Sequence, residues 1–426
     1  MDSIIIIGAG AAGLMAAYEL SKHNKNIILL EAKNRLGGRI HTVYDPAFSQ
    51  HLETGAEFIH GNLPLTFCLL KEAGIPYHTI SGKMVHLKKE KNKVVKDDEN
   101  DNWDEAMDEM KNLKADMPLK NFLDTFFNDD KYKALRSSVK NFAGGFDLAD
   151  ITTASTKSLY REWKEEWGDQ YRVDGGYKLL IDYLEKQCKK NGCIINTNCC
   201  AKKISWQKNE VNIITMCSRF FKGNKLVVTV PVSVLQKNNK SEDYIEFAPA
   251  IPEHINAAKN IGFGTVIKIF LEFEESFWSK KTNDAAFIIT EENISTWWTQ
   301  LPVKNNLLIG WVGGEKAISL KDNTNEEILG LALQSLANTF QINIDLIKTK
   351  LKASKVSNWW KEPDINGGYS FNTIKSVDAK KVLEKPVENT IFFSGEALYQ
   401  EVPIGTVEAA LASGKKTAQQ VLKIIK

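Results

Sequence analysis

The feature that most restricts the fold lies near the start of the sequence, where four isoleucines run directly into a glycine-rich loop. Ile4–Ile7 form an uninterrupted β-branched run, a pattern typical of a buried parallel strand. The loop Gly8-Ala9-Gly10-Ala11-Ala12-Gly13 follows, and an apolar helical stretch covers residues 14–20. A second apolar run, residues 27–30, ends at Glu31, which lies 21 residues beyond Gly10. This order of strand, glycine loop, helix, strand and acid predicts a dinucleotide-binding βαβ unit.

Each part of this unit has a physical role in holding a nucleotide. Gly8 and Gly10 let the backbone turn tightly against a pyrophosphate, and the helix that follows offers free N–H groups and the positive end of its dipole. Gly13 completes the G-x-G-x-x-G spacing, and Glu31 has the spacing of an acid that accepts from a ribose hydroxyl. These four residues are the first candidates for cofactor binding.

Composition narrows the class of protein. With 426 residues, 43% of them hydrophobic, the chain is predicted to form two or three domains and cannot be a disordered tail or a disulfide mini-scaffold. The 55 Lys and Arg residues nearly cancel the 53 Asp and Glu residues, so we expect a small-molecule function without nucleic acid. The six cysteines show no paired framework or metal-binding spacing, which favours a reduced cytoplasmic protein without a metal site. The first residues are interpreted as a strand and not a signal peptide, and no long apolar run predicts a membrane span.

The segment after Glu31 indicates which dinucleotide binds. It reads Glu31-Ala32-Lys33-Asn34-Arg35-Leu36-Gly37-Gly38-Arg39-Ile40-His41-Thr42, with a second glycine pair and two arginines that a nicotinamide dehydrogenase does not need. The pattern E-A-x-x-R-x-G-G-R-x-x-T after G-x-G-x-x-G resembles the flavin-containing amine oxidase family, which binds FAD. The resemblance implies that Arg35, Gly38 and Arg39 contact the FAD near its phosphates and ribityl chain.

This resemblance covers essentially the whole chain and implies an α/β fold. A Rossmann-like FAD-binding domain is expected to interleave with an α+β substrate-binding domain, as in the amine oxidase and p-hydroxybenzoate hydroxylase type of fold. We expect the FAD-binding domain at residues 1–80, 171–240 and 356–426, and the substrate-binding domain at 81–170 and 241–355. The charged residues between 88 and 117 are interpreted as a solvated helix face.

Lys268 is the first candidate for chemistry. It lies in a predicted strand over residues 265–273, and its in-phase neighbours Val266 and Phe270 are apolar, which favours a buried ammonium over one pointing outward. The stretch resembles the family's G-x-V-x-K strand. The resemblance implies that Lys268 holds a water against the flavin N5 atom.

The region from Trp359 to Phe371 resembles the family's W…G-x-Y-S-x segment. This implies that Trp359 contacts the cofactor and that Tyr369 is the aromatic that stands before the flavin and guides the amine. Animal monoamine oxidases have a flavin-bonded cysteine where this chain has Gly368. We therefore expect FAD to be held non-covalently.

Two further stretches complete the expected cofactor site. Residues 392–397 resemble the family's F-x-G-E-A motif, which implies that Gly395 and Glu396 contact the ribityl and pyrophosphate region. Residues 405–410 open the last helix, which is expected to end near Gly414. Its N-terminus would stabilise negative charge on the flavin, so Thr406 and Val407 are candidate contacts.

The substrate side departs from the family pattern. The family's second cage aromatic would fall near Thr406, so an aromatic cage needs its second wall from a residue such as Trp297, Trp298 or Trp311. Residues 55–61 resemble the G-A-E-W-I-H-G stretch of animal polyamine oxidases, which makes His60 a candidate substrate contact. No arginine lies between Arg39 and Arg136, which argues against an L-amino-acid oxidase.

Together these features predict an FAD-dependent amine oxidase that uses a primary amine or polyamine and O2. Hydride would pass from the carbon beside a neutral nitrogen to flavin N5, with an imine and H2O2 as products. The alternatives are an amino-acid oxidase or desaturase of the same fold, or a non-catalytic FAD-binding or demethylase-type protein. A monomer or homodimer is expected.

Overall fold

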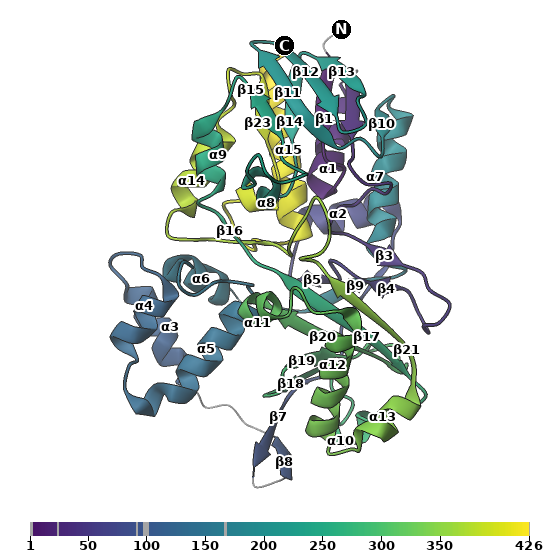
Figure 1. The fold of residues 1–426 in the computed structure, drawn as a ribbon, viewed down its shortest axis with the longest axis vertical. Helices are drawn as coiled ribbons and strands as arrows, with labels where there is room; N and C mark the ends of the chain where they lie inside the picture. The colour runs from purple at the N-terminus through teal and green to yellow at the C-terminus, as the bar shows by residue number, and fades with distance from the viewer. Residues whose placement is uncertain (1–2, 24, 91–92, 97–101, 166–167, 426) are drawn as a thin grey trace.

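The computed structural model describes residues 3–23, 25–90, 93–96, 102–165 and 168–425. Its first part is built on a five-stranded parallel sheet with the order β10-β2-β1-β14-β23 (Figure 1). The strands are β1 (Ser3–Ile7), β2 (Asn26–Leu30), β10 (Ile194–Asn196), β14 (Lys225–Val228) and β23 (Ile391–Phe393). The central strand β1 is covered on both faces, which explains why Ile4–Ile7 are all apolar and all buried.

One face of this sheet carries helices and the other carries a second sheet. The helices are α1 (Ala11–Ser21), α2 (Pro64–Ala73), α7 (Lys178–Lys190) and α15 (Val407–Ile424), and they pack on Ile4, Ile6 and their neighbours. The opposite face, with Ile5 and Ile7, packs on a four-stranded sheet ordered β13-β12-β11-β15 and on short helices. These elements are β11 (Ala201–Gln207), β12 (Glu210–Thr215), β13 (Phe220–Gly223), β15 (Glu246–Ala248), α8 (Val232–Leu235), α9 (Pro252–Ala258) and α14 (Ser376–Glu384).

The last helix is longer than the sequence suggested. It runs through Gly414 to Ile424, so the predicted end near Gly414 is wrong. A Cβ added at Gly414 would lie 2.3 Å from the carbonyl oxygen of Ala12. The glycine therefore allows α15 to approach α1 closely and does not terminate the helix.

The second part of the molecule contains a seven-stranded sheet with the order β21-β17-β20-β19-β18-β7-β8. Its strands are β7 (Met84–Glu90), β8 (Lys93–Lys96), β17 (Val266–Phe273), β18 (Phe287–Thr290), β19 (Thr296–Trp298), β20 (Leu307–Gly313) and β21 (Leu351–Asn358). Helix α12 (Asn325–Phe340) covers one face together with α10 (Ser279–Thr282) and α13 (Ile344–Lys350), and α11 (Gly314–Ser319) follows β20 (Figure 1). Alternation along β17 sends Ile267 and Ile269 to the α12 face, and Val266 and Phe270 to the opposite face.

A helical lobe packs beside this sheet and encloses an apolar cluster of its own. It comprises α3 (Trp103–Asn112), α4 (Leu119–Phe126), the short helix η1 (Asp130–Tyr132), α5 (Lys133–Gly145) and α6 (Thr156–Trp163). Small sheets connect the parts: β3 (Thr42–Val43) with β4 (Leu52–Glu53), β5 (Phe58–His60) with β9 (Gln170–Val173) and β6 (Tyr77–Thr79), and β16 (Gly262–Phe263) with β22 (Ser370–Phe371). A short helix, η2 (Glu396–Leu398), follows β23.

The α/β fold class predicted from the sequence is confirmed, but one local interpretation is not. The charged segment 88–117 is not a single helix face, because β7 pairs with β8 as antiparallel strands and, among its described residues, only 103–112 are helical. The charged residues 97–101 lie outside the described part of the chain. No helix within the described ranges combines the length and apolarity needed to cross a bilayer.

The domain division stays a prediction. All five strands of the parallel sheet fall within the three segments expected for the FAD-binding domain. Strand β15 lies in a segment expected for the substrate-binding domain, yet it pairs with β11 beside the parallel sheet.

Candidate active site

A cavity of about 1340 Å³ lies where the parallel sheet, the seven-stranded sheet and the helical lobe meet. It brings together most of the site residues predicted from the sequence, although these come from both ends and the middle of the chain. The predicted residues that line it are Gly8, Gly10, Glu31, Gly38, Arg39, His60, Lys268, Trp359, Tyr369, Gly395, Glu396, Thr406 and Val407. Gly13 and Arg35 do not line the cavity.

Two glycine loops form one end of the cavity. The N–H of Gly37 donates to the carbonyl of Ala9 at 2.9 Å, and Gly10 and Gly37 form a short parallel bridge. A Cβ added at Gly13 would lie 1.9 Å from the carbonyl oxygen of Gly8, so Gly13 allows α1 to pack directly on the first loop. The two loops therefore present bare backbone to the cavity.

The groups around these loops fit an extended dinucleotide. Glu31 accepts N–H bonds from Ala9 at 2.7 Å and Lys33 at 3.0 Å, and burial raises its pKa although those bonds oppose the shift. Arg35 donates through Nη1 to Gly38 and Ile40, whereas its buried Nη2 has no acceptor among the described residues. Arg35 does not line the cavity, so its bonds support the second glycine loop from behind.

The N-termini of two helices open on the same cavity. Ala11 and Ala12 at the start of α1, and Val407 at the start of α15, line its wall. Thr406 caps α15 by accepting the N–H of Ala409 at 3.2 Å. Helix N-termini favour anions, so this arrangement suits a negatively charged group in the cavity.

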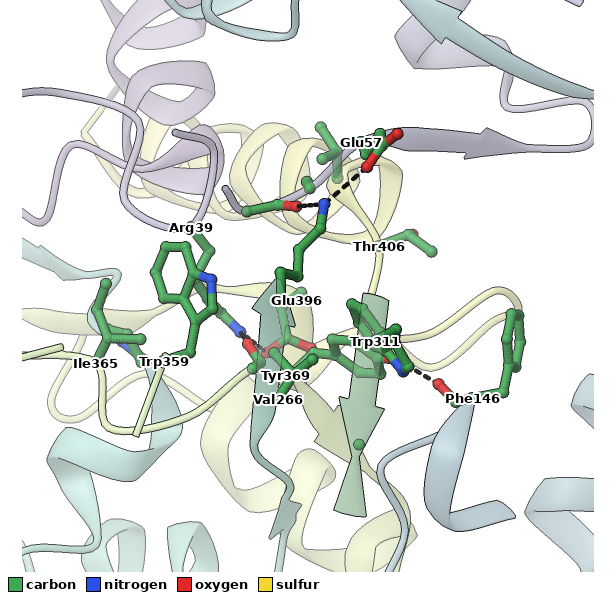
Figure 2. A pocket seen from close by; sticks show the side chains of 18 of the residues that line it. Arg39, Glu57, Phe146, Val266, Trp311, Trp359, Ile365, Tyr369, Glu396 and Thr406 are labelled. Carbon is green, nitrogen blue, oxygen red and sulfur yellow. Dashed lines mark hydrogen bonds and ion pairs between the residues drawn. The ribbon is translucent and has the colours of Figure 1, made fainter. Parts of the chain in front are cut away.

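An ion pair joins the second glycine loop to the closing segment of the chain. Arg39 Nη1 lies 2.6 Å from Glu396 Oε1 and 3.0 Å from the carbonyl oxygen of Gly368 (Figure 2). The hydroxyl of Ser370 donates to the other oxygen of Glu396 at 2.6 Å. Three of the motifs found in the sequence are thus bonded to one another at the cavity wall.

Lys268 lies on β17, 1% exposed, and its ammonium is fully engaged by protein groups. Its Nζ donates to Glu57 Oε2 at 2.7 Å, to the carbonyl of Glu53 at 2.5 Å and to the carbonyl of Gly55 at 3.2 Å. An ammonium has three N–H donors, and three acceptors surround this one. Figure 2 shows the position of Glu57 in this cavity.

Glu57 is the central functional residue that the sequence interpretation missed. It is buried, and it also accepts from Arg172 Nε and Trp298 Nε1, each at 3.0 Å. Burial alone would raise the pKa of Glu57, but the charges of Lys268 and Arg172 lower it below its ordinary value. An acid in the otherwise uncharged stretch 54–59 was the available signal, by the same reasoning that selected Lys268.

Aromatic side chains form the adjoining wall. The hydroxyl of Tyr369 donates to the carbonyl of Phe146, and Trp311 Nε1 donates to the carbonyl of Gly145 at 2.7 Å. Tyr369 and Trp311 pack on the same apolar cluster, and Figure 2 shows both on this side of the cavity. Gly405 lies against the ring of Tyr369, since a Cβ there would come within 2.8 Å of Cδ2.

The three tryptophans considered for a second aromatic wall lie in different places in the structure. Trp311 and Trp298 line the cavity, with ring centroids 5.8 Å apart. Trp297 instead packs in the core beneath α12 and does not line the cavity, so it cannot form the second wall. Trp311 is the candidate that packs with Tyr369.

His60 lines the cavity between two aromatic rings. Its ring centroid lies 5.9 Å from that of Phe58 and 5.7 Å from that of Phe146. Burial lowers the pKa of His60 to about 4, so the imidazole is neutral at neutral pH. It therefore presents an uncharged polar group beside an apolar surface.

A parallel sheet with a glycine loop after its first strand and a second glycine loop facing it is the arrangement typical of dinucleotide-binding folds. A sequence model described as flavin containing amine oxidoreductase matches residues 11–422, and the chain belongs to that family. A flavin is therefore the cofactor that the family implies.

Individual relatives are distant but match the chain over its length. It is 25% identical to lysine-specific histone demethylase 1B of Mus musculus over 98% of this chain and 52% of that protein. It is also 25% identical to polyamine oxidase 4 of Oryza sativa subsp. japonica, over 99% and 89% respectively. The chain thus spans about half the length of the demethylases it matches.

Solved structures show the same fold. A putrescine oxidase bound to putrescine superimposes with a TM-score of 0.81 at 18% identity, covering 99% of both chains. Cyclohexylamine oxidase from Brevibacterium oxydans superimposes with a TM-score of 0.81 at 17% identity, covering 100% of this chain and 99% of that one.

Proposed function

We propose that this protein is an FAD-dependent amine oxidase that converts an amine to an imine and reduces O2 to H2O2. One observation carries the proposal: a single cavity is lined by the two glycine loops, the buried Lys268 and the aromatic wall of Tyr369 and Trp311. When bound, the flavin would supply the acceptor for a hydride from the carbon beside the amine nitrogen, and would return the electrons to O2.

Side chains of the cavity wall would orient the substrate and set the charge around it. Tyr369 and Trp311 are held rigidly by hydrogen bonds to the end of α5, so their rings can orient a substrate without reorganising. The neutral His60 adds a polar contact without repelling a cation. Lys268, fixed by Glu57, places a positive charge on the cavity wall, and a water held by Lys268 would share one of its three engaged donors.

The cofactor is proposed to be FAD held without a covalent bond. Gly368 lines the cavity, and a Cβ at this position would lie 2.6 Å from Leu148 Cδ1 and 3.1 Å from Val266 Cγ1. The site therefore has no thiol at this position and little room for one. Acid precipitation should release the yellow colour into the supernatant, and colour retained in the protein pellet would contradict the proposal.

The charges at the aromatic end favour a monoamine with an apolar body over a polyamine. Phe58, Phe287 and Ile289 add apolar surface there, and Glu315 is accompanied by Lys140 and Lys316. These three charged side chains sum to one positive charge, which disfavours a second substrate ammonium beside them by Coulomb repulsion. Among the described residues of the cavity wall, Arg39 is the only arginine and it is paired with Glu396, which disfavours a substrate carboxylate.

A peroxide-release screen of the purified protein tests both parts. We expect release with benzylamine or cyclohexylamine, weaker release with putrescine and spermidine, and none with amino acids. Bleaching of the flavin under nitrogen separates amine oxidation from the use of O2. A preference for spermidine would overturn only the monoamine assignment, whereas the absence of peroxide release with every amine would overturn the oxidase proposal.

A further inference from the structure

Two cysteines meet where the small sheet joins the parallel sheet. Cys199 precedes β11, and Cys217 lies in the turn between β12 and β13. Strands β11 and β12 are antiparallel, with Ala201 opposite Thr215, and the N–H of Met216 donates to the carbonyl of Cys200 at 2.8 Å. The chain then turns, since the N–H of Ser218 donates to the carbonyl of Thr215 at 3.0 Å, and this turn holds Cys217 beside the segment that carries Cys199.

Side-chain contacts bring the two cysteines close together. Arg219 Nη1 donates to Cys199 Sγ at 2.8 Å, and Cys217 Sγ donates to the carbonyl of Asn198, the residue before Cys199, at 3.6 Å. Both sulfurs therefore lie beside the same short segment and the same guanidinium. Neither cysteine is used by the proposed oxidase chemistry.

The two thiols differ in the way that a reactive pair requires. Cys199 is buried and burial raises its pKa, whereas Cys217 is exposed. The hydroxyl of Thr215 lies 3.1 Å from Cys217 Sγ, and this hydrogen bond, with the nearby charge of Arg219, lowers the pKa of Cys217. An exposed thiol of lowered pKa is the nucleophile, and a neighbouring thiol can resolve it.

The pair also adjoins the nucleotide end of the cavity. The N–H of Cys199 donates to the carbonyl of Glu31 at 2.8 Å, and the N–H of Asn198 donates to the carbonyl of Lys33 at 2.9 Å. Cys199 itself lines the cavity together with Glu31. A covalent change at Cys199 would act directly on the backbone that positions the acid expected to bind the ribose.

We propose that Cys217 and Cys199 form a peroxide-reactive site. The Cys217 thiolate attacks one oxygen of H2O2, the O–O bond breaks, and hydroxide leaves, so that Cys217 becomes a sulfenic acid. The Cys199 sulfur then attacks the Cys217 sulfur, the S–O bond breaks, and water leaves with the Cys199 proton. Two thiols are oxidised to one disulfide while one peroxide is reduced to two waters. The proposed oxidase activity would supply this peroxide, and only that source rests on the proposed function.

Added peroxide tests the site itself. The holoenzyme, without amine, is treated with H2O2 in small molar excess, alkylated under denaturing conditions, digested and analysed by mass spectrometry. We expect the loss of two alkylatable thiols and a cross-linked peptide pair joining residues 199 and 217, lighter by two hydrogens and reversed by dithiothreitol. A cross-link that excludes these two residues, or an unmodified Cys217, would overturn the proposal.

Variants distinguish the nucleophile from the resolving thiol. Cys217→Ser should abolish the loss of both thiols, whereas Cys199→Ser should leave a sulfenic acid on Cys217 that dimedone traps. The matched control is Cys68→Ser, because Cys68 is also exposed but lies on α2, away from the pair. Equal protection by Cys68→Ser would refute a specific reaction at Cys217.

A final arm separates this proposal from the proposed function. The same analysis is run with amine and O2 in place of added peroxide, with and without catalase. A disulfide that forms with added peroxide but not with any amine would leave the cysteine site intact and count against the oxidase. Peroxide release from an amine without formation of the disulfide would support the oxidase and count against the cysteine site.

Discussion

Replacing Glu57 with glutamine should destabilise the protein strongly, although the substitution changes only one non-hydrogen atom at the end of one side chain. The carboxylate is buried and accepts from Lys268 at 2.7 Å and from Arg172 at 3.0 Å. Glutamine would leave both cations buried and uncompensated, and would turn a donating amide group towards one of them. Breaking a buried ion pair from one side costs about 3–5 kcal/mol.

This cost corresponds to a measurable shift in melting temperature. An unfolding entropy of about 2.1 cal/mol/K per residue gives about 0.9 kcal/mol/K for 426 residues, if the chain unfolds in one step. The expected decrease in Tm is therefore about 3–6 °C. The pKa of Glu57 is depressed in the folded state, so its contribution is complete above the ordinary value of 4.5 and is lost as the pH falls through the folded pKa.

Thermal unfolding of the holoenzyme at neutral pH is the assay, followed by circular dichroism. The matched control is Glu246→Gln, which removes an exposed pair with Lys203 at 2.8 Å and should cost about 0–1 kcal/mol. The difference between wild type and Glu57→Gln should be constant near neutrality and should shrink in acid. Equal Tm shifts for the two variants would show that Glu57 does not carry a buried ionic cluster.

Three further outcomes are expected. Lys268→Met should retain FAD but slow turnover with O2, and unchanged O2 kinetics would remove Lys268 from the mechanism. Gly368→Ala should lower stability by about 1–3 kcal/mol, because its Cβ would lie 2.6 Å from Leu148 Cδ1; urea unfolding measures this, and a neutral effect would show that Leu148 yields freely. The pKa of His60 is lowered to about 4, so the folded state binds fewer protons than the unfolded state between about pH 4 and the ordinary value of 6.5. The free energy of unfolding should therefore fall on acidification through this range, and less steeply in His60→Gln; parallel curves for the two proteins would contradict this. Amine turnover should rise above neutral pH as the neutral amine accumulates, and a rate that falls from neutral to alkaline pH would contradict that expectation.

Local patterns predicted which glycine-loop residues lie together in the fold. The isoleucine run, the glycine spacing and Glu31 are short-range signals, and the structure places Gly8, Gly10 and Glu31 at one cavity. Arg35 does not line the cavity and donates to loop carbonyls, so its expected contact with the cofactor stays a prediction.

The cluster around Lys268 could not be predicted in the same way. Glu57 precedes β5, Arg172 lies on β9 and Lys268 lies on β17, and only the pairing of Phe58 with Arg172 across β5 and β9 brings the first two together. No spacing along the chain records that pairing. The length of α15 escaped prediction for a related reason, since Gly414 is explained by Ala12 on another helix.

The distance in sequence between α1 and α15 has a consequence for biosynthesis. Every residue of α1 except Glu19 is buried in the finished protein, and α15 packs directly on it. At about 5–20 residues per second, the first residue of α15 follows the end of α1 by about 20–80 s. During that interval the nascent chain carries an apolar helix whose partner helix has not yet been synthesised. Chaperones that bind apolar segments of nascent chains should therefore improve the yield of folded protein, and translation pauses before residue 407 should reduce that yield.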